Sequence, residues 1–127
     1  MNTIQTSCGC SCSAGPKLIF SCSGAADVGE LADQAARKLS RNGKGKMFCQ
    51  AGIGGRVSGM IKSTEAAASI LAFDGCALDC TKKSLEEAGF TRINHLRLTD
   101  LGFEKGDTEI RPDTIAQVVD KAEIFLS

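Results

Sequence analysis

The chain lacks any excess of charge, because its 15 lysine and arginine residues are balanced by 15 aspartate and glutamate residues. Without a net positive charge, no long-range field would draw the protein to nucleic acid or to an anionic membrane. The chain also has no apolar run approaching the roughly 18 residues of a membrane-spanning helix. We therefore expect neither nucleic acid nor a membrane as a partner.

We also expect no secretory leader, since residues 1–13 contain no basic segment followed by an apolar stretch. We therefore expect a soluble protein of the cytoplasm. In that reducing compartment, cysteines serve metals or redox chemistry more often than structural disulfides. The odd number of cysteines, seven, also argues against a fully paired disulfide framework.

The chain has 127 residues, of which 43% are hydrophobic, enough for one domain with its own core. Short apolar runs, typical of buried strands, alternate with longer amphipathic runs, typical of helices. We predict strands at residues 17–22, 46–49, 69–74 and 93–98, and helices at residues 27–39, 56–67, 78–88 and 112–126.

This alternation predicts an α/β fold: a single three-layer α/β/α domain built on a four-stranded, mostly parallel sheet. We expect a flavodoxin-like strand order, 2-1-3-4, which opens a crevice at the carboxyl edge between the first and third strands. Residues 16–127 would form this domain. Residues 1–15 would form a cysteine-containing arm, because they show no hydrophobic pattern.

Four cysteines stand where a predicted strand gives way to a loop or a helix: Cys22, Cys49, Cys76 and Cys80. Because the ends of parallel strands share one edge, these side chains should converge. Neighbouring strands lie about 4.8 Å apart, and thiolates on one zinc ion, each about 2.3 Å from the metal, have a similar spacing. Cys76 and Cys80 would also share the first turn of a helix, which favours thiolate.

Two observations weaken this prediction. A free cysteine is often only a small buried hydrophobe, so some of the four could be core residues. The C-x-x-x-C spacing is also weaker evidence for zinc than the C-x-x-C spacing of zinc ribbons. The support comes from the set of four together.

Three segments around these cysteines resemble the DGC-domain family, described as zinc-binding proteins of uncertain function. They are residues 22–29 (CSGAADVG), 49–55 (CQAGIGG) and 74–80 (DGCALDC), within a resemblance that runs from Leu18 to about Lys105. The chain departs from the family pattern at Gln50, where leucine is common, and at Ala77, where proline is common. The family's four metal-chelating cysteines correspond to Cys22, Cys49, Cys76 and Cys80. The resemblance implies zinc binding and supplies no substrate or reaction.

Cys8, Cys10 and Cys12 alternate with glycine and serine in the arm. One interpretation is a mobile arm that takes up a soft metal or reaches a thiol on a partner protein. The other is a dispensable tail.

Two further motifs are incomplete. The Gly52–Gly55 segment lacks the Lys-Ser or Lys-Thr of a P-loop, so we expect a tight turn there. A phosphatase loop would need an arginine about six residues after Cys22, where Val28 and Gly29 stand instead.

The polar residues around the cysteines have structural and functional interpretations. We expect His95 to be a packed or surface histidine away from the cysteine edge. Asp74 and Asp79 are expected to cap the following helix, with orientation of the site as the alternative. Lys105 would be an exposed lysine or a positive charge near the thiolates.

We therefore favour a metal-binding protein that stores, senses or transfers zinc through Cys22, Cys49, Cys76 and Cys80. Four protein thiolates leave no open position for hydrolytic chemistry. Copper(I) or an iron–sulfur cluster would suit the same donors. The alternative is a thiol redox or sulfur-transfer enzyme in which Cys76 attacks and Cys80 or Cys22 resolves.

Overall fold

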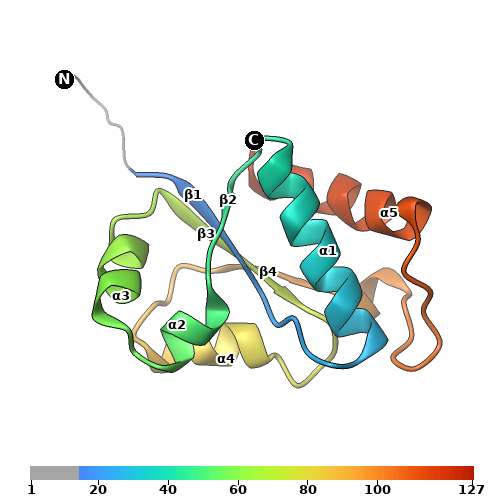
Figure 1. The fold of residues 1–127 in the computed structure, drawn as a ribbon, viewed down its shortest axis with the longest axis horizontal. Helices are drawn as coiled ribbons and strands as arrows, with labels where there is room; N and C mark the ends of the chain where they lie inside the picture. Colours follow the sequence, from blue (N-terminus) through green and yellow to red (C-terminus); the bar gives the residue numbers. More distant parts are fainter. Residues whose placement is uncertain (1–14) are drawn as a thin grey trace.

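Four parallel strands form one sheet, in the order β2-β1-β3-β4, in this computed structural model, which describes residues 15–127 (Figure 1). The strands are β1 (Lys17–Ser21), β2 (Lys46–Met47), β3 (Ser69–Asp74) and β4 (Asn94–Arg97). All neighbouring pairs are parallel, so the predicted class and strand order are confirmed. Apart from Gly15, the predicted arm with Cys8, Cys10 and Cys12 lies outside the described residues.

Helices cover both faces of the sheet (Figure 1), which confirms the predicted three layers. One face carries α1 (Asp27–Arg41) and α5 (Pro112–Ala122). The other carries α2 (Gln50–Gly54), α3 (Ser58–Glu65) and α4 (Cys80–Glu87). Two short 3-10 helices, η2 (Leu98–Leu101) and η3 (Glu123–Phe125), follow β4 and α5. Within residues 15–127, no helix has the length and apolar character needed to cross a membrane.

The core is divided in two by the alternation of side chains along the central strands. Ile19 and Phe73 pack with side chains of α1 and α5, whereas Leu18 and Phe20 pack with side chains of α2 and α4. Successive residues of a strand point to opposite faces. Because both faces are covered, these strands are continuous apolar runs in the sequence.

The region around β2 differs from the sequence prediction. β2 ends at Met47 instead of reaching Cys49. Of the glycine segment expected to be a tight turn, Gly52 and Gly54 belong to the short helix α2, and Gly55 caps the end of that helix. The helix expected over residues 56–67 is present as the shorter α3, and α2 is an additional short helix before it. Arg56 between them has φ of 58°, a left-handed conformation through which a right-handed helix cannot continue.

The start of α4 also differs. Asp79 has a left-handed backbone with φ of 55°, so the helix begins at Cys80 and not near Leu78. Cys76 therefore lies in the turn before α4. The expectation that Cys76 and Cys80 share the first helical turn was wrong, and only Cys80 is placed there.

The turns that follow β1 and β3 touch at two glycines. A Cβ atom at Gly75 would lie 2.8 Å from the carbonyl carbon of Val28 and 2.9 Å from the nitrogen of Gly29. A Cβ atom at Gly29 would lie 2.7 Å from the oxygen of Gly24. These separations are too short for real Cβ contacts. A side chain at Gly75 would push the two turns apart, and one at Gly29 would push α1 away from the turn that precedes it.

Both ends of the described chain lie near the amino edge of the sheet. The Gly15 N–H donates to the carbonyl oxygen of Ala66 at 3.2 Å, just before β3 begins. Lys17 Nζ, at the start of β1, donates to the carbonyl oxygen of Leu126 at 2.6 Å. The carboxyl edge is thus remote from both ends.

We expect Gly75→Ala to lower the free energy of unfolding by about 1–3 kcal/mol, the usual cost of forcing extra atoms into packed structure. Gly59→Ala is the matched control, because a Cβ atom there meets nothing within 4 Å. Since Gly59 lies within α3, this change should stabilise the protein by about 0.5–1 kcal/mol. Denaturant unfolding measures both variants, and an unchanged Gly75→Ala variant would contradict the contact between the turns.

Candidate metal centre

The backbone brings all four predicted cysteines to the carboxyl edge of the sheet. Cys22 follows β1 directly, and its N–H donates to the carbonyl oxygen of Phe73 at 3.1 Å, so pairing of β1 with β3 continues up to the cysteine. Cys49 immediately precedes α2, Cys76 lies in the turn after β3, and Cys80 is the first residue of α4.

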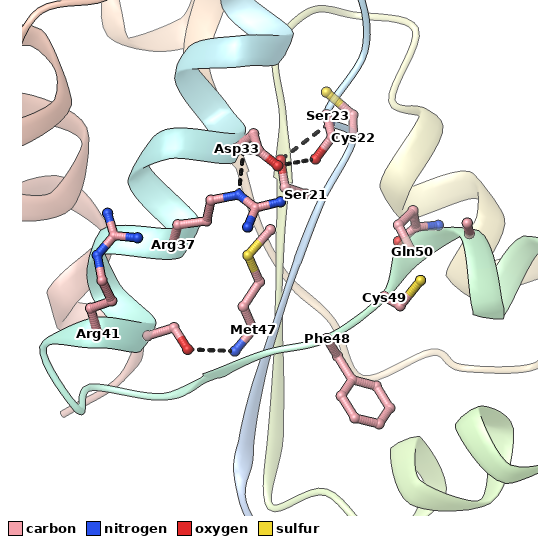
Figure 2. A pocket seen from close by; sticks show the side chains of 12 residues that line it. Ser21, Cys22, Ser23, Asp33, Arg37, Arg41, Met47, Phe48, Cys49 and Gln50 are labelled. Carbon is pink, nitrogen blue, oxygen red and sulfur yellow. Dashed lines mark hydrogen bonds and ion pairs between the residues drawn. The ribbon is translucent and has the colours of Figure 1, made fainter.

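Three of these cysteines share one cavity. Cys22, Cys76 and Cys80 line a cavity of about 220 Å³, together with Lys105. Cys49 lines a neighbouring pocket of about 770 Å³, which Cys22 also lines. In Figure 2 the side chains of Cys22 and Cys49 come from different segments, and their sulfur atoms do not face each other. Cys22 therefore lines both the cavity and the neighbouring pocket.

The sulfur atoms are not assembled into a tetrahedral site. Among residues 15–127, the one group of three Cys, His, Asp or Glu ligand atoms that all lie within 4.8 Å of one another is Asp74, Asp79 and His95. The four cysteines of the sheet edge are free thiols, and their sulfur atoms suit a soft or borderline metal. Holding one ion would therefore require the cysteine side chains and the Cys49 segment to move inward.

Lys105 joins the cavity from a loop far along the chain. Its Nζ donates to Cys76 Sγ at 3.7 Å. Asp27 holds this loop, because its carboxylate accepts the N–H groups of Gly106 at 2.9 Å and Thr108 at 2.8 Å. These hydrogen bonds lower the pKa of the Asp27 carboxyl group. Of the two interpretations of Lys105, the structure favours a positive charge at the cysteines.

Asp74, the last residue of β3, caps α4 from outside the helix. Its buried carboxylate accepts the N–H groups of Thr81 at 2.8 Å and Lys82 at 3.1 Å. The first N–H groups of a helix have no partner within the helix. The capping role expected for Asp74 is confirmed.

Asp79 pairs with an arginine of β4 instead of capping α4. Its carboxylate accepts hydrogen bonds from Arg97 Nε at 2.9 Å and Arg97 Nη2 at 2.7 Å. This two-pronged ion pair lowers the pKa of Asp79. Because the Asp79 side chain makes no capping hydrogen bond, the capping expectation was wrong for this residue.

His95 lies closer to the cysteine edge than expected. Its Nε2 is 2.8 Å from a carboxylate oxygen of Asp74 and 3.6 Å from one of Asp79. Both aspartates line the cysteine cavity. His95 and Arg97 are two residues apart on β4 and therefore point to the same face. That alternation is the sequence signal for a polar network behind the turn between β3 and α4.

Comparison with known proteins adds an independent observation. Residues 18–122, which include all four cysteines of the sheet edge, match the family described as the DGC domain. The anaerobic and virulence modulator AnvM of Pseudomonas aeruginosa is 36% identical over 88 residues, which are 69% of this chain and 67% of AnvM. No solved structure matches the chain.

We predict that Asp79→Asn destabilises the protein near neutral pH and that the difference from the wild type shrinks below about pH 4. The folded protein lowers the pKa of Asp79. Its contribution to stability is therefore fully present above the pKa of the unfolded chain and is lost as the pH falls through the folded-state pKa.

Asp100→Asn is the matched control, since Asp100 contacts the same arginine but its side chain is 64% exposed. Urea unfolding near neutral pH and at about pH 3 measures both variants. Equal loss of stability in the two variants near neutral pH would contradict a stabilising role for the Asp79–Arg97 pair.

Proposed function

This chain belongs to the DGC-domain family, and we propose that it is a metal-binding protein that holds zinc at the carboxyl edge of its sheet. The ligands would be Cys22, Cys49, Cys76 and Cys80. One observation carries the proposal: three of the four line one cavity, although they follow two different strands. Zinc sites that serve a structural role commonly use four such thiolates in tetrahedral geometry.

Cys49 would complete the site by moving. It is exposed and stands between the two-residue strand β2 and the five-residue helix α2. Such short elements make few contacts, and a segment of this kind opens at a low cost in free energy. A fourth ligand that moves supports uptake and release of metal, and hence storage, sensing or transfer.

The AnvM relative is named as a modulator, which is a regulatory description and supports sensing among these roles. A protein partner that exchanges metal or thiols with this chain would suit sensing and transfer equally. Copper(I) and iron–sulfur clusters use the same donors, and metal analysis distinguishes them from zinc.

Metal analysis of anaerobically purified protein tests the proposal. We expect about one zinc ion per chain, and about four thiols that become reactive only after chelation, as for a closed tetrahedral site. Cys76→Ser should lose most of the metal. The triple serine variant of Cys8, Cys10 and Cys12 is the matched control and should keep it. Full metal content in a folded Cys76→Ser variant would contradict the four-cysteine site.

A thiol redox or sulfur-transfer enzyme is the second candidate, and the contact between Lys105 and Cys76 favours it. A positive charge beside a sulfur atom is a feature of reactive cysteines. In this function Cys76 would attack, and Cys80 or Cys22, which line the same cavity, would resolve the product.

Alkylation kinetics separate the two functions. A reactive Cys76 predicts one fast thiol in metal-free protein, which is absent in Cys76→Ser and slowed in Lys105→Met. Lys83→Met is the control, because Lys83 is an exposed lysine that does not line the cavity. If zinc protects all four thiols and the metal-free thiols react at equal rates, the metal-binding function is supported and the enzyme is not.

A further inference from the structure

The pocket that Cys22 shares with Cys49 has a polar lining of its own. It has a volume of about 770 Å³ and lies between the ends of β1 and β2, the second half of α1 and the start of α2. Figure 2 shows Arg37 and Arg41 on one side of this pocket and Cys49 and Gln50 on the other. The metal site proposed above involves only the two cysteines of this lining.

The lining carries one net positive charge, because its charged residues are Arg37, Arg41 and Asp33. Asp33 accepts a hydrogen bond from Arg37 Nε at 2.7 Å and another from Ser23 Oγ at 2.7 Å. Within residues 15–127, the terminal nitrogens of Arg37 donate no hydrogen bond to an acidic group, and the guanidinium group of Arg41 forms no ion pair. Arginine presents several N–H groups in a plane, which suits a carboxylate.

Gln50 provides the second polar feature. Its side-chain nitrogen and oxygen are buried and find no hydrogen-bond partner among the described residues, 15–127. Leaving a buried amide unpaired costs free energy, so a partner that both donates and accepts would be favourable. An amide group of a ligand is such a partner, and rotation of the Gln50 side chain would bring the two together in the pocket.

Sulfur is the third feature, since Cys22 and Cys49 line this pocket and Cys22 also lines the cavity with Cys76 and Cys80. A thiol held here would lie beside the sulfur atoms that bind the metal. Cys49 has to move to reach the other three, so the fourth position on a metal is open to another thiolate from the same side.

We propose that this pocket binds a small anionic thiol, of the class of thiol-bearing peptides with free carboxylates. Arg37 and Arg41 would hold the carboxylates, and Gln50 would pair with a peptide amide. The thiol would lie between Cys22 and Cys49. The thiol would replace Cys49 as the fourth ligand of the zinc ion and so speed the release of zinc. This step rests on the proposed metal site.

Binding is tested first on the reduced, metal-free protein, so that the pocket is examined apart from the metal. S-methylglutathione, which has the carboxylates and amides but no free thiol, is titrated calorimetrically. We expect saturable binding that weakens at least about tenfold in Arg37→Met/Arg41→Met, as for loss of two charge-assisted contacts. Arg92→Met, an exposed arginine outside the pocket, is the matched control and should bind as the wild type does.

Zinc release is tested second, on zinc-loaded protein with a chromophoric chelator. Glutathione should speed release with saturation, and 2-mercaptoethanol at the same thiolate concentration should not. The double arginine variant should lose this difference while keeping its zinc.

The possible outcomes are distinct. No saturable binding of S-methylglutathione, or equally tight binding of inorganic phosphate, would overturn the ligand assignment. Binding of S-methylglutathione by a protein that fails to take up zinc when zinc is supplied would support the pocket and contradict the metal site. Equal rates of zinc release with both thiols would overturn the exchange role.

Discussion

The parallel pairing of β1 with β3 is the interaction on which the cysteine edge depends. Five residue pairs, from Lys17 with Ser69 to Ser21 with Phe73, set the register, and the Cys22 N–H extends it by one more hydrogen bond. Both strands therefore end at the same level, about 4.8 Å apart. Because both faces of these strands are packed against helices, a one-residue slip in register would send each side chain to the opposite core and disrupt both cores. Packing thus holds the two cysteine turns side by side.

The direction in which two of the cysteines leave the sheet is set by strained neighbours. Ser23 and Asp79 have left-handed backbones, with φ of 50° and 55°, which is costly for residues other than glycine. Each is tied down by its side chain, Ser23 to Asp33 and Asp79 to Arg97. The geometry of the edge therefore depends on charged groups that lie outside it.

The sequence predicted what local patterns control. Continuous apolar runs predicted the sheet and its order, and the position of Cys22 at a strand end predicted its place at the edge. The left-handed residues Arg56 and Asp79 were missed, because nothing in the local sequence marks them. The partner of Asp79 is Arg97, which lies 18 residues further along the chain.

The same limit applies to the site. Lys105 donates to Cys76, which lies 29 residues earlier in the sequence. The loop that carries Lys105 is held by a hydrogen bond to Asp27, the first residue of α1. Whether the four sulfur atoms close on an ion depends on side-chain positions, which neither apolar periodicity nor motif spacing encodes.

The location of the chain ends has a practical meaning. The backbones of Gly15 and Leu126 each form a hydrogen bond at the amino edge of the sheet. This edge is at the opposite end of β1 from Cys22. A further domain, an affinity tag or a solid support joined after Leu126 would be attached at the edge of the sheet opposite the cysteines. The domain could thus be displayed on a larger assembly with its thiols still open to solution.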